Sequence, residues 1–447
     1  MKGTRSWNGI TAAISRTWRL LSASFWFLPT VLTLAALLIA PMLVQVDEWL
    51  QATGRSVEWL DWIYGGKLQG ARRLMSAIAA AMMAITTVMF SSQTTALTFI
   101  GQEYGSRLLR NFLADSRNQI AFGTYISTFV YALMVLRTIH KDPDEAPVPH
   151  LAVSFGILLA MAGLGLLIYS MYHISRFLQS STIINYAAKD LDTTIRRLTG
   201  VPDADESRRA DWPLADCPGL PLHAPTDGYL QYVKEPRLLK LCRLAGCRIR
   251  INLRIGDFVV AGTTIATVSG AVSLDASLRK QIVAGIVLGT QPSIEQDLRY
   301  AVNQFVQIAL RAASSDRNDV LTANMCVDRM GAALCLLARR LPPPEIRCDE
   351  EGIPRLMLQT SGFAEALDTF IRPIREFKDS TPSLTACLLG MAGTVAGSVE
   401  RKDDREALRQ EVQWILAAAK DRIGDGPAWG PIERAYDAAC RALVARS

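Results

Sequence analysis

One uninterrupted polar run stands out within the apolar stretch 74–102 of this chain: Ser91, Ser92, Gln93, Thr94 and Thr95. Consecutive residues point to all sides of a helix, so part of this run must face other helices or water if the stretch crosses a bilayer. Such groups either hydrogen-bond between helices or line a water-filled path. The apolar stretch 118–136 adds three hydroxyl groups that share one helical face, those of Thr124, Thr128 and Tyr131.

Two groups of arginines are candidates for binding anions. Arg107 and Arg110 lie on one face of a predicted helix that continues out of the first of these stretches, at the level of lipid phosphates. Arg248, Arg250 and Arg254 alternate with apolar residues, which is the period of a strand with one basic face. Because guanidinium groups bind phosphate bidentately, an anionic lipid, ligand or partner is expected opposite this face. Simple membrane anchoring and an ordinary solvated face are the alternatives.

A polar turn between two predicted helices brings together Arg311, Asn318 and Asp319. Their convergence would create a polar binding site. The alternative interpretation is that Asn318 or Asp319 caps the second helix by accepting a hydrogen bond from its first amides. In the apolar stretch 151–175, His173 is expected to be hydrogen-bonded within the structure, and a role in proton transfer is the alternative.

The sequence contains none of the strong catalytic signatures. A phosphate-binding G-x-x-x-x-G-K-[ST] loop, an H-E-x-x-H zinc motif and a G-x-S-x-G nucleophile elbow are all missing. The four histidines do not cluster, and no C-x-x-C pair occurs. The sequence therefore predicts no metal and no cofactor, and it does not favour an enzyme.

Four stretches without Asp, Glu, Lys or Arg must position these residues: 25–46, 74–102, 118–136 and 151–175. A hydrocarbon core ~30 Å thick requires roughly 20 helical residues, so each stretch is long enough to cross a membrane. In the last one, Gly156, Ala160 and Gly163 form a small-residue stripe that predicts close contact with another helix. The sequence thus predicts four transmembrane helices.

Loop charges predict the orientation of these helices. The basic segments before the first stretch and after the second and fourth are expected in the cytoplasm, and the acidic or mixed loops outside. All eight cysteines follow the last stretch, which agrees with reduced thiols in the cytosol. We expect a multi-pass protein of a bacterial inner membrane with both termini inside. The net charge of +6 then indicates anionic lipid rather than nucleic acid.

The remaining sequence divides by composition and period. A four-helix transmembrane domain with juxtamembrane helices is expected over 1–200, and a linker rich in Pro, Asp and Arg over 201–223. Residues 224–273 alternate with period two between glycines, which predicts a small β-barrel-like module. Residues 274–447 carry helical periodicity throughout. The predicted fold class is an all-α membrane domain followed by a cytosolic α+β region, consisting of this module plus a helical bundle.

Several segments together resemble one known family, the Domain of Unknown Function 2254 family of predicted bacterial integral membrane proteins. They are SFWFLP, FSSQTTAL, SRLLRNFLADSRNQ and GTYISTFVYALMVLRT in the membrane region, and DGYLQYV, GDFVVAG, EQD and IALRAAS further on. The resemblance covers nearly the whole chain. It implies an integral membrane protein, and it implies no particular activity.

The polar run and the large C-terminal region suggest two functions. The polar residues of the stretch 74–102 favour a homo-oligomeric, channel- or transporter-like assembly in the lipid bilayer. The large region after residue 200 favours a membrane-anchored sensor or scaffold that binds an anionic ligand or a protein. An enzyme is the third alternative.

Overall fold

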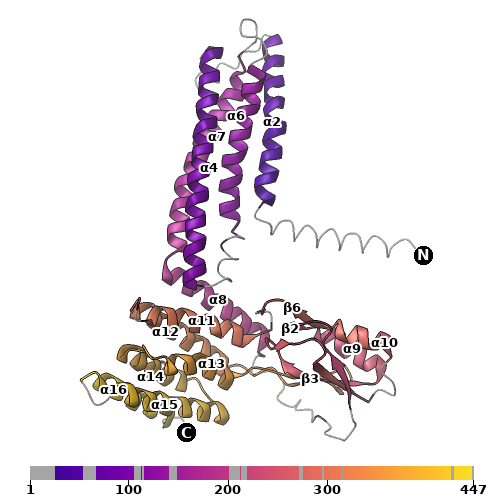
Figure 1. The fold of residues 1–447 in the computed structure, drawn as a ribbon, viewed down its shortest axis with the longest axis vertical. Helices are drawn as coiled ribbons and strands as arrows, with labels where there is room; N and C mark the ends of the chain where they lie inside the picture. The colour runs from indigo at the N-terminus through magenta and orange to yellow at the C-terminus, as the bar shows by residue number, and fades with distance from the viewer. Residues whose placement is uncertain are drawn as a thin grey trace. The chain divides into compact units, whose positions relative to one another are not determined.

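The computed structural model describes residues 26–53, 67–104, 112, 115–139, 148–200, 212, 219–270, 275–293, 296–314, 316–423 and 427–444. Contacts within the chain divide it into two compact units, Met1–Gln179 and Ser180–Ser447, whose elements are labelled in Figure 1.

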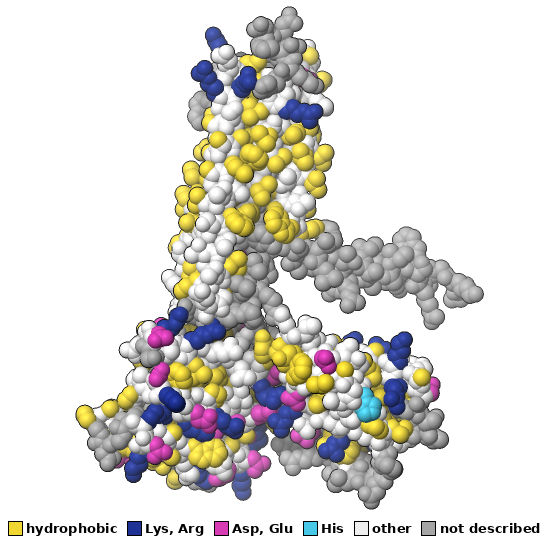
Figure 2. Space-filling model, viewed as in Figure 1, with side chains coloured by type: hydrophobic (Ala, Val, Ile, Leu, Met, Phe, Trp, Pro, Cys, Tyr) yellow, Lys and Arg dark blue, Asp and Glu magenta, His cyan; other side chains and the backbone are white. Residues whose placement is uncertain are grey.

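Long helices make up the described part of the first unit: α2 (Phe27–Ala52), α4 (Leu68–Tyr104), α6 (Ser116–Ile139) and α7 (His150–Phe177). At 1.5 Å per residue, even the shortest spans about 36 Å, more than the hydrocarbon core of a bilayer. Helix α6 contacts the other three and is the most enclosed of them. Hydrophobic side chains cover much of the face of this unit that Figure 2 shows. Its exposed large apolar residues include Leu38, Met42 and Met161. Such a surface is typical of contact with lipid.

The predicted small-residue stripe on α7 packs against α4. A methyl group placed on Gly156 would come within 2.9 Å of Met75 Cε, and one on Gly163 within 3.3 Å of Met82 Sδ. Both methionines are buried. The second glycine–methionine pair lies seven residues further along both helices than the first, so α4 and α7 run parallel in close contact. The expected close helix contact is confirmed at these two glycines.

Strands of the second unit form two sheets. The five-stranded sheet has the order β1-β5-β3-β8-β7, and the three-stranded sheet has the order β4-β2-β6. The strands are β1 (Leu220–His223), β2 (Gly228–Val233), β3 (Arg248–Arg254), β4 (Phe258–Val259), β5 (Thr264–Ser269), β6 (Ile286–Gly289), β7 (Ile346–Cys348) and β8 (Pro354–Gln359). In β3, Ile249 and Ile251 are buried and Arg250 is exposed, so the predicted alternation is confirmed.

The sheets extend beyond the predicted module. Strand β1 lies in the segment expected to be a linker, while β6, β7 and β8 lie where only helices were expected, so a wholly helical region after residue 274 is wrong. Strand β8 pairs in parallel with β3 about a hundred residues earlier. A parallel partner needs a long crossover and leaves no local turn signal, which explains the error. The pairings among the described residues give two sheets and no closed barrel.

Helices complete the second unit: α8 (Ser180–Leu198), α9 (Glu235–Ala245), α10 (Ala276–Val283), α11 (Leu298–Ala313), α12 (Val320–Ala338), α13 (Phe363–Glu376), α14 (Pro382–Ala396), α15 (Lys402–Ile423) and α16 (Trp429–Val444). Helix α8 contacts α11 and α12, so it belongs to this unit, although the sequence groups it with the membrane spans. Within the described residues, five helices are long and apolar enough to cross a membrane, and α12 is the fifth. It packs against α8, α11, α13 and α14.

Candidate functional site

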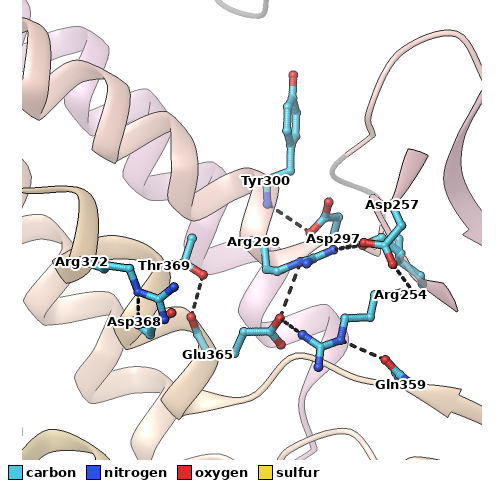
Figure 3. Close-up of polar contacts among 11 residues, drawn as sticks. Arg254, Asp257, Asp297, Arg299, Tyr300, Gln359, Glu365, Asp368, Thr369 and Arg372 are labelled. Carbon is cyan, nitrogen blue, oxygen red and sulfur yellow. Dashed lines mark hydrogen bonds and ion pairs between the residues drawn. The ribbon is translucent and has the colours of Figure 1, made fainter. Parts of the chain in front are cut away.

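Charged side chains meet where the five-stranded sheet joins the helices of the second unit (Figure 3). We call this cluster the polar junction: Arg254, Asp257, Asp297, Arg299 and Glu365. Two of its members lie at the end of β3 and in the turn that follows it, two at the start of α11, and Glu365 in the first turn of α13. The junction therefore ties the sheet to two helices, and a hollow of about 490 Å³ opens beside it.

Two arginines hold the junction together. The Arg254 guanidinium donates from Nη1 to Glu365 Oε1 at 2.9 Å and from Nε to Gln359 Oε1 at 2.9 Å. Nη2 of Arg299 donates to Asp257 Oδ1 at 2.9 Å and to the Ile255 carbonyl at 3.0 Å. Charge-assisted hydrogen bonds of this kind are the strong ones in proteins. The junction thus has defined geometry, with three carboxylates facing two guanidinium groups.

Asp297 is the most enclosed acid of the junction. Its Oδ1 accepts a hydrogen bond from the Tyr300 amide at 3.1 Å and so caps α11. Its other oxygen lies against Gly256, whose φ is +93°. A Cβ on Gly256 would lie only 2.0 Å from Asp297 Oδ2. Only glycine fits both the backbone conformation and this approach.

Burial raises the pKa of Asp297 to about 6, and the nearby Arg299 and two backbone amides only partly oppose this. The free carboxyl has a pKa near 3.9 in an unfolded chain. Between these values the folded state binds more protons than the unfolded state, so the contribution of Asp297 to stability falls as pH rises through about 4 to 6. Two pKa units correspond to about 3 kcal/mol.

Asp297→Asn should therefore have a higher free energy of unfolding than wild type at pH 7.5. This gain over wild type should be larger at pH 7.5 than at pH 4, by up to about 3 kcal/mol. Asn keeps the capping oxygen but removes the buried charge. Urea unfolding of the full-length protein at the two pH values measures this difference. Asp316→Asn, at an exposed position, is the control. The same effect of Asp297→Asn at both pH values would contradict the assignment.

A second hollow of the same unit, which we call the cleft, has a volume of about 530 Å³. Gln296 borders it and binds the Val233 backbone at two points, accepting from the amide at 2.9 Å and donating to the carbonyl at 3.2 Å. Gln296 and Asp297 are neighbours, so one short segment joins the cleft to the polar junction.

The polar residues of the run in α4 point in different directions, some into the helix bundle and some to its outer surface. Gln93 is buried and its Nε2 has no hydrogen-bond partner among the described residues, whereas Ser91, Thr94 and Thr95 are exposed on the outside of the bundle. The hydroxyls of Thr94 and Thr95 donate to carbonyls four residues earlier in their own helix, at 2.9 and 3.0 Å. Ser92 Oγ lies 3.7 Å from Met171 Sδ of α7.

The three hydroxyls of α6 also remain local or face a neighbouring helix. Thr124 and Thr128 donate to carbonyls of α6 at 2.9 and 2.7 Å. Tyr131 is fully buried and donates to the Ala152 carbonyl of α7 at 2.7 Å. Of these three hydroxyls, that of Tyr131 links α6 to a neighbouring helix.

The arginine candidates are separated by the structure. Arg107 and Arg110 lie outside the described residues. On β3, Arg250 is exposed, and Arg254 pairs with Glu365 of the same chain. An anionic lipid, ligand or partner opposite this face stays a prediction. Nε of Arg248 is buried without a hydrogen-bond partner among the described residues.

At the predicted polar turn, Asp319 caps α12 by accepting from the Thr322 amide at 3.1 Å, so the capping interpretation is confirmed. The neighbouring residue Asn318 has a positive φ of 48°. Arg311 lies in the last turn of α11.

The sequence did not predict the partners of two side chains in the first unit. Asp47, which follows the uncharged stretch 25–46, is buried in α2 and accepts hydrogen bonds from the Leu151 and Ala152 amides of α7, both at 3.0 Å. His173 is hydrogen-bonded as expected, and its partner is Asp115 Oδ2 at 2.7 Å from Nε2. No group of three metal-ligating side chains occurs within the described ranges.

The comparisons with known proteins agree with this architecture. A family model described as a predicted membrane protein (DUF2254) matches residues 22–394. The chain belongs to this family. DUF2254 relatives include uncharacterised proteins of Mycobacterium bovis and Mycobacterium tuberculosis, each 27% identical over 370 residues, with 81% of this chain and 71% of the relative covered. No solved structure matches. The described residues of three segments that carry the DUF2254 resemblance, 227–233, 256–262 and 296–297, adjoin one another, because Gln296 binds Val233 and Asp297 lies against Gly256.

Proposed function

We propose that this membrane protein forms a homo-oligomer through α4 and acts as a channel- or transporter-like assembly in a bacterial inner membrane, with both termini in the cytoplasm. The supporting observation is a stripe of small residues along the exposed face of α4. Its members are all exposed and alternate in spacing between three and four: Ala77, Ala80, Ala84, Thr87, Ser91, Thr94, Thr98 and Gly101. We call this set the α4 stripe.

The α4 stripe differs from the rest of the bundle surface. Exposed positions on α2 and α7 carry large side chains such as Leu38 and Met161. Large residues also flank the stripe, including Met83 and Phe90. Small residues let two helix backbones approach closely in lipid, and spacing of three and four is that of a helix–helix seam. A second copy of α4 carries the same stripe of small residues, so we propose it as the partner helix.

A path for solute would then run between copies. Inside one bundle, the space is occupied by buried side chains that include Met82, Met89, Tyr125 and Tyr131. The exposed hydroxyls of Ser91, Thr94 and Thr98 provide a polar lining only where several copies of α4 surround an axis. Thr94 and Thr98 already bond to their own helix backbone, so they can face either a partner or water.

Ser91→Phe tests the α4 interface. A phenyl ring in the middle of the stripe holds the helices apart, so we expect wild type to contain several copies and the variant mostly one. Light scattering of full-length protein in non-ionic detergent measures particle mass, and dye-reported ion flux into liposomes measures transport. Met161→Phe, at an exposed position of α7, is the matched control.

A single-copy wild type, or an unchanged mass in Ser91→Phe, would overturn the interface. An oligomeric wild type without flux of any monovalent ion would overturn the path. The second candidate function is a membrane-anchored sensor, and the cleft of the second unit favours it because a simple anchor needs no such hollow.

A further inference from the structure

The polar junction carries one negative charge that its arginines do not neutralise (Figure 3). Arg254 pairs with Glu365. Arg299 pairs with Asp257 at 2.9 Å and lies 3.7 Å from Glu365. Three carboxylates against two guanidinium groups leave a net charge of −1, and within the described residues Asp297 is the acid of the junction that forms no ion pair. Its side chain is nevertheless buried, since the residue is only 5% exposed.

Backbone amides supply only part of the missing positive charge. The Tyr300 amide donates to Asp297 Oδ1, but the start of a helix carries only about half a unit of positive charge. Burial still raises the pKa of Asp297 to about 6, so these amides do not compensate the carboxylate fully. Above that pH the side chain is both ionised and buried. A cationic group beside it would stabilise this charged form.

The hollow beside the junction provides room for such a group. Its volume of about 490 Å³ lies within the range of small-molecule sites, and Asp297 is one of its lining residues. Phe258 and Tyr300 also line it, and Phe258 is 58% exposed although it is apolar. Aromatic faces attract organic ammonium groups. Asn303 and Thr369 add neutral polar groups to the lining.

We infer that this hollow binds an organic monocation, an ammonium group on a small apolar body, with the charge against Asp297 and the body against the aromatic residues. A monocation balances the charge of the junction, while an anion is repelled and a polycation exceeds it. The described residues contain no group of three metal-ligating side chains, so a bare metal ion is not favoured. The inference goes beyond the proposed assembly and does not depend on oligomerisation through α4.

The test uses full-length protein in phosphatidylcholine nanodiscs at pH 7.5 and constant ionic strength. Four probes are compared: butylammonium, ammonium, butanol and butyrate. We expect butylammonium to raise the unfolding temperature with saturation, because binding to the folded state stabilises it. Ammonium lacks the apolar body, butanol lacks the charge and butyrate carries the opposite charge, so none of these three should do so.

The affinity for butylammonium should depend on pH. The charged groups around Asp297 are Arg254 at the end of β3, Asp257 in the turn after it, Arg299 of α11 and Glu365 of α13. Their mutual pairing favours their charged forms. With a pKa of about 6, Asp297 is mostly ionised at pH 7.5 and mostly protonated at pH 5. The apparent affinity should therefore fall by about tenfold from pH 7.5 to pH 5.

Two variants separate the charge from the space. Asp297→Asn keeps the capping oxygen but removes the unpaired charge, so it should fold and no longer bind butylammonium. Asp316→Asn, at an exposed position, is the matched control and should bind as wild type does. Asn303→Trp leaves every charge in place but fills the hollow, and it should also abolish the effect.

No stabilisation by butylammonium would overturn the inference, as would equal stabilisation by butanol or by ammonium. Retained binding in Asp297→Asn or Asn303→Trp, loss of binding in Asp316→Asn, or the same affinity at both pH values would also overturn it. Particle mass, measured on the same samples, reports on the α4 interface separately, so failure of one proposal is distinguishable from failure of the other.

Discussion

Gly256→Ala is expected to lower the free energy of unfolding of the second unit by roughly 3–5 kcal/mol. The φ of +93° costs an L-residue about 1–3 kcal/mol. The new methyl group would also lie 2.0 Å from Asp297 Oδ2, so Asp297 must move away. Its cap on α11 would then be lost, at a further cost of about 1 kcal/mol, together with packing at the junction. Urea unfolding followed by circular dichroism measures the change.

Gly262→Ala provides a control with the same backbone requirement. Its φ is +84°, but among the described residues, apart from its two chain neighbours, no atom lies within 4 Å of the position of a new Cβ. The difference between the two variants isolates the contact with Asp297. Equal losses would show that the contact carries no energy. Adding Asp297→Gly to Gly256→Ala should recover the part of the loss that comes from the clash.

Asp47→Ala is expected to destabilise the first unit by roughly 2–4 kcal/mol. The side chain is 5% exposed and accepts from two amides at the start of α7, whose own N-cap residue Pro149 offers no side-chain hydrogen bond. Removing the carboxylate leaves one buried and one partly buried N–H group without this acceptor, and a buried group left unpaired costs about 1–3 kcal/mol. Thermal unfolding of full-length protein in nanodiscs measures the effect.

Two neighbouring variants define this prediction further. Asp47→Asn keeps one carbonyl acceptor, so its loss should lie between wild type and Asp47→Ala. Glu48→Ala changes the adjacent, exposed acid and should alter stability by less than about 0.5 kcal/mol. If Asp47→Ala behaves like Glu48→Ala, the carboxylate does not cap α7 and its burial needs another explanation.

The local features of the chain could be predicted from sequence because they depend on neighbouring residues. Long uncharged stretches form helices α2, α4, α6 and α7, since a bilayer-length apolar segment satisfies its own backbone groups only as a helix. Strand β3 has the predicted alternation. Asp319 caps α12 because the cap and the amide it binds are three residues apart.

The tertiary structure alone decided which side chains meet. Arg254 finds Glu365 across 111 positions, and Asp47 finds the Leu151 amide across 104. Strand β8 pairs with β3 only after a long crossover, so its short sequence carries no sign of its partner. The polar run of α4 shows the same limit. Its residue types alone predict polar contacts, but only the packed bundle decides that Gln93 is buried and Ser91 exposed, because neighbouring helices determine which face of α4 is covered.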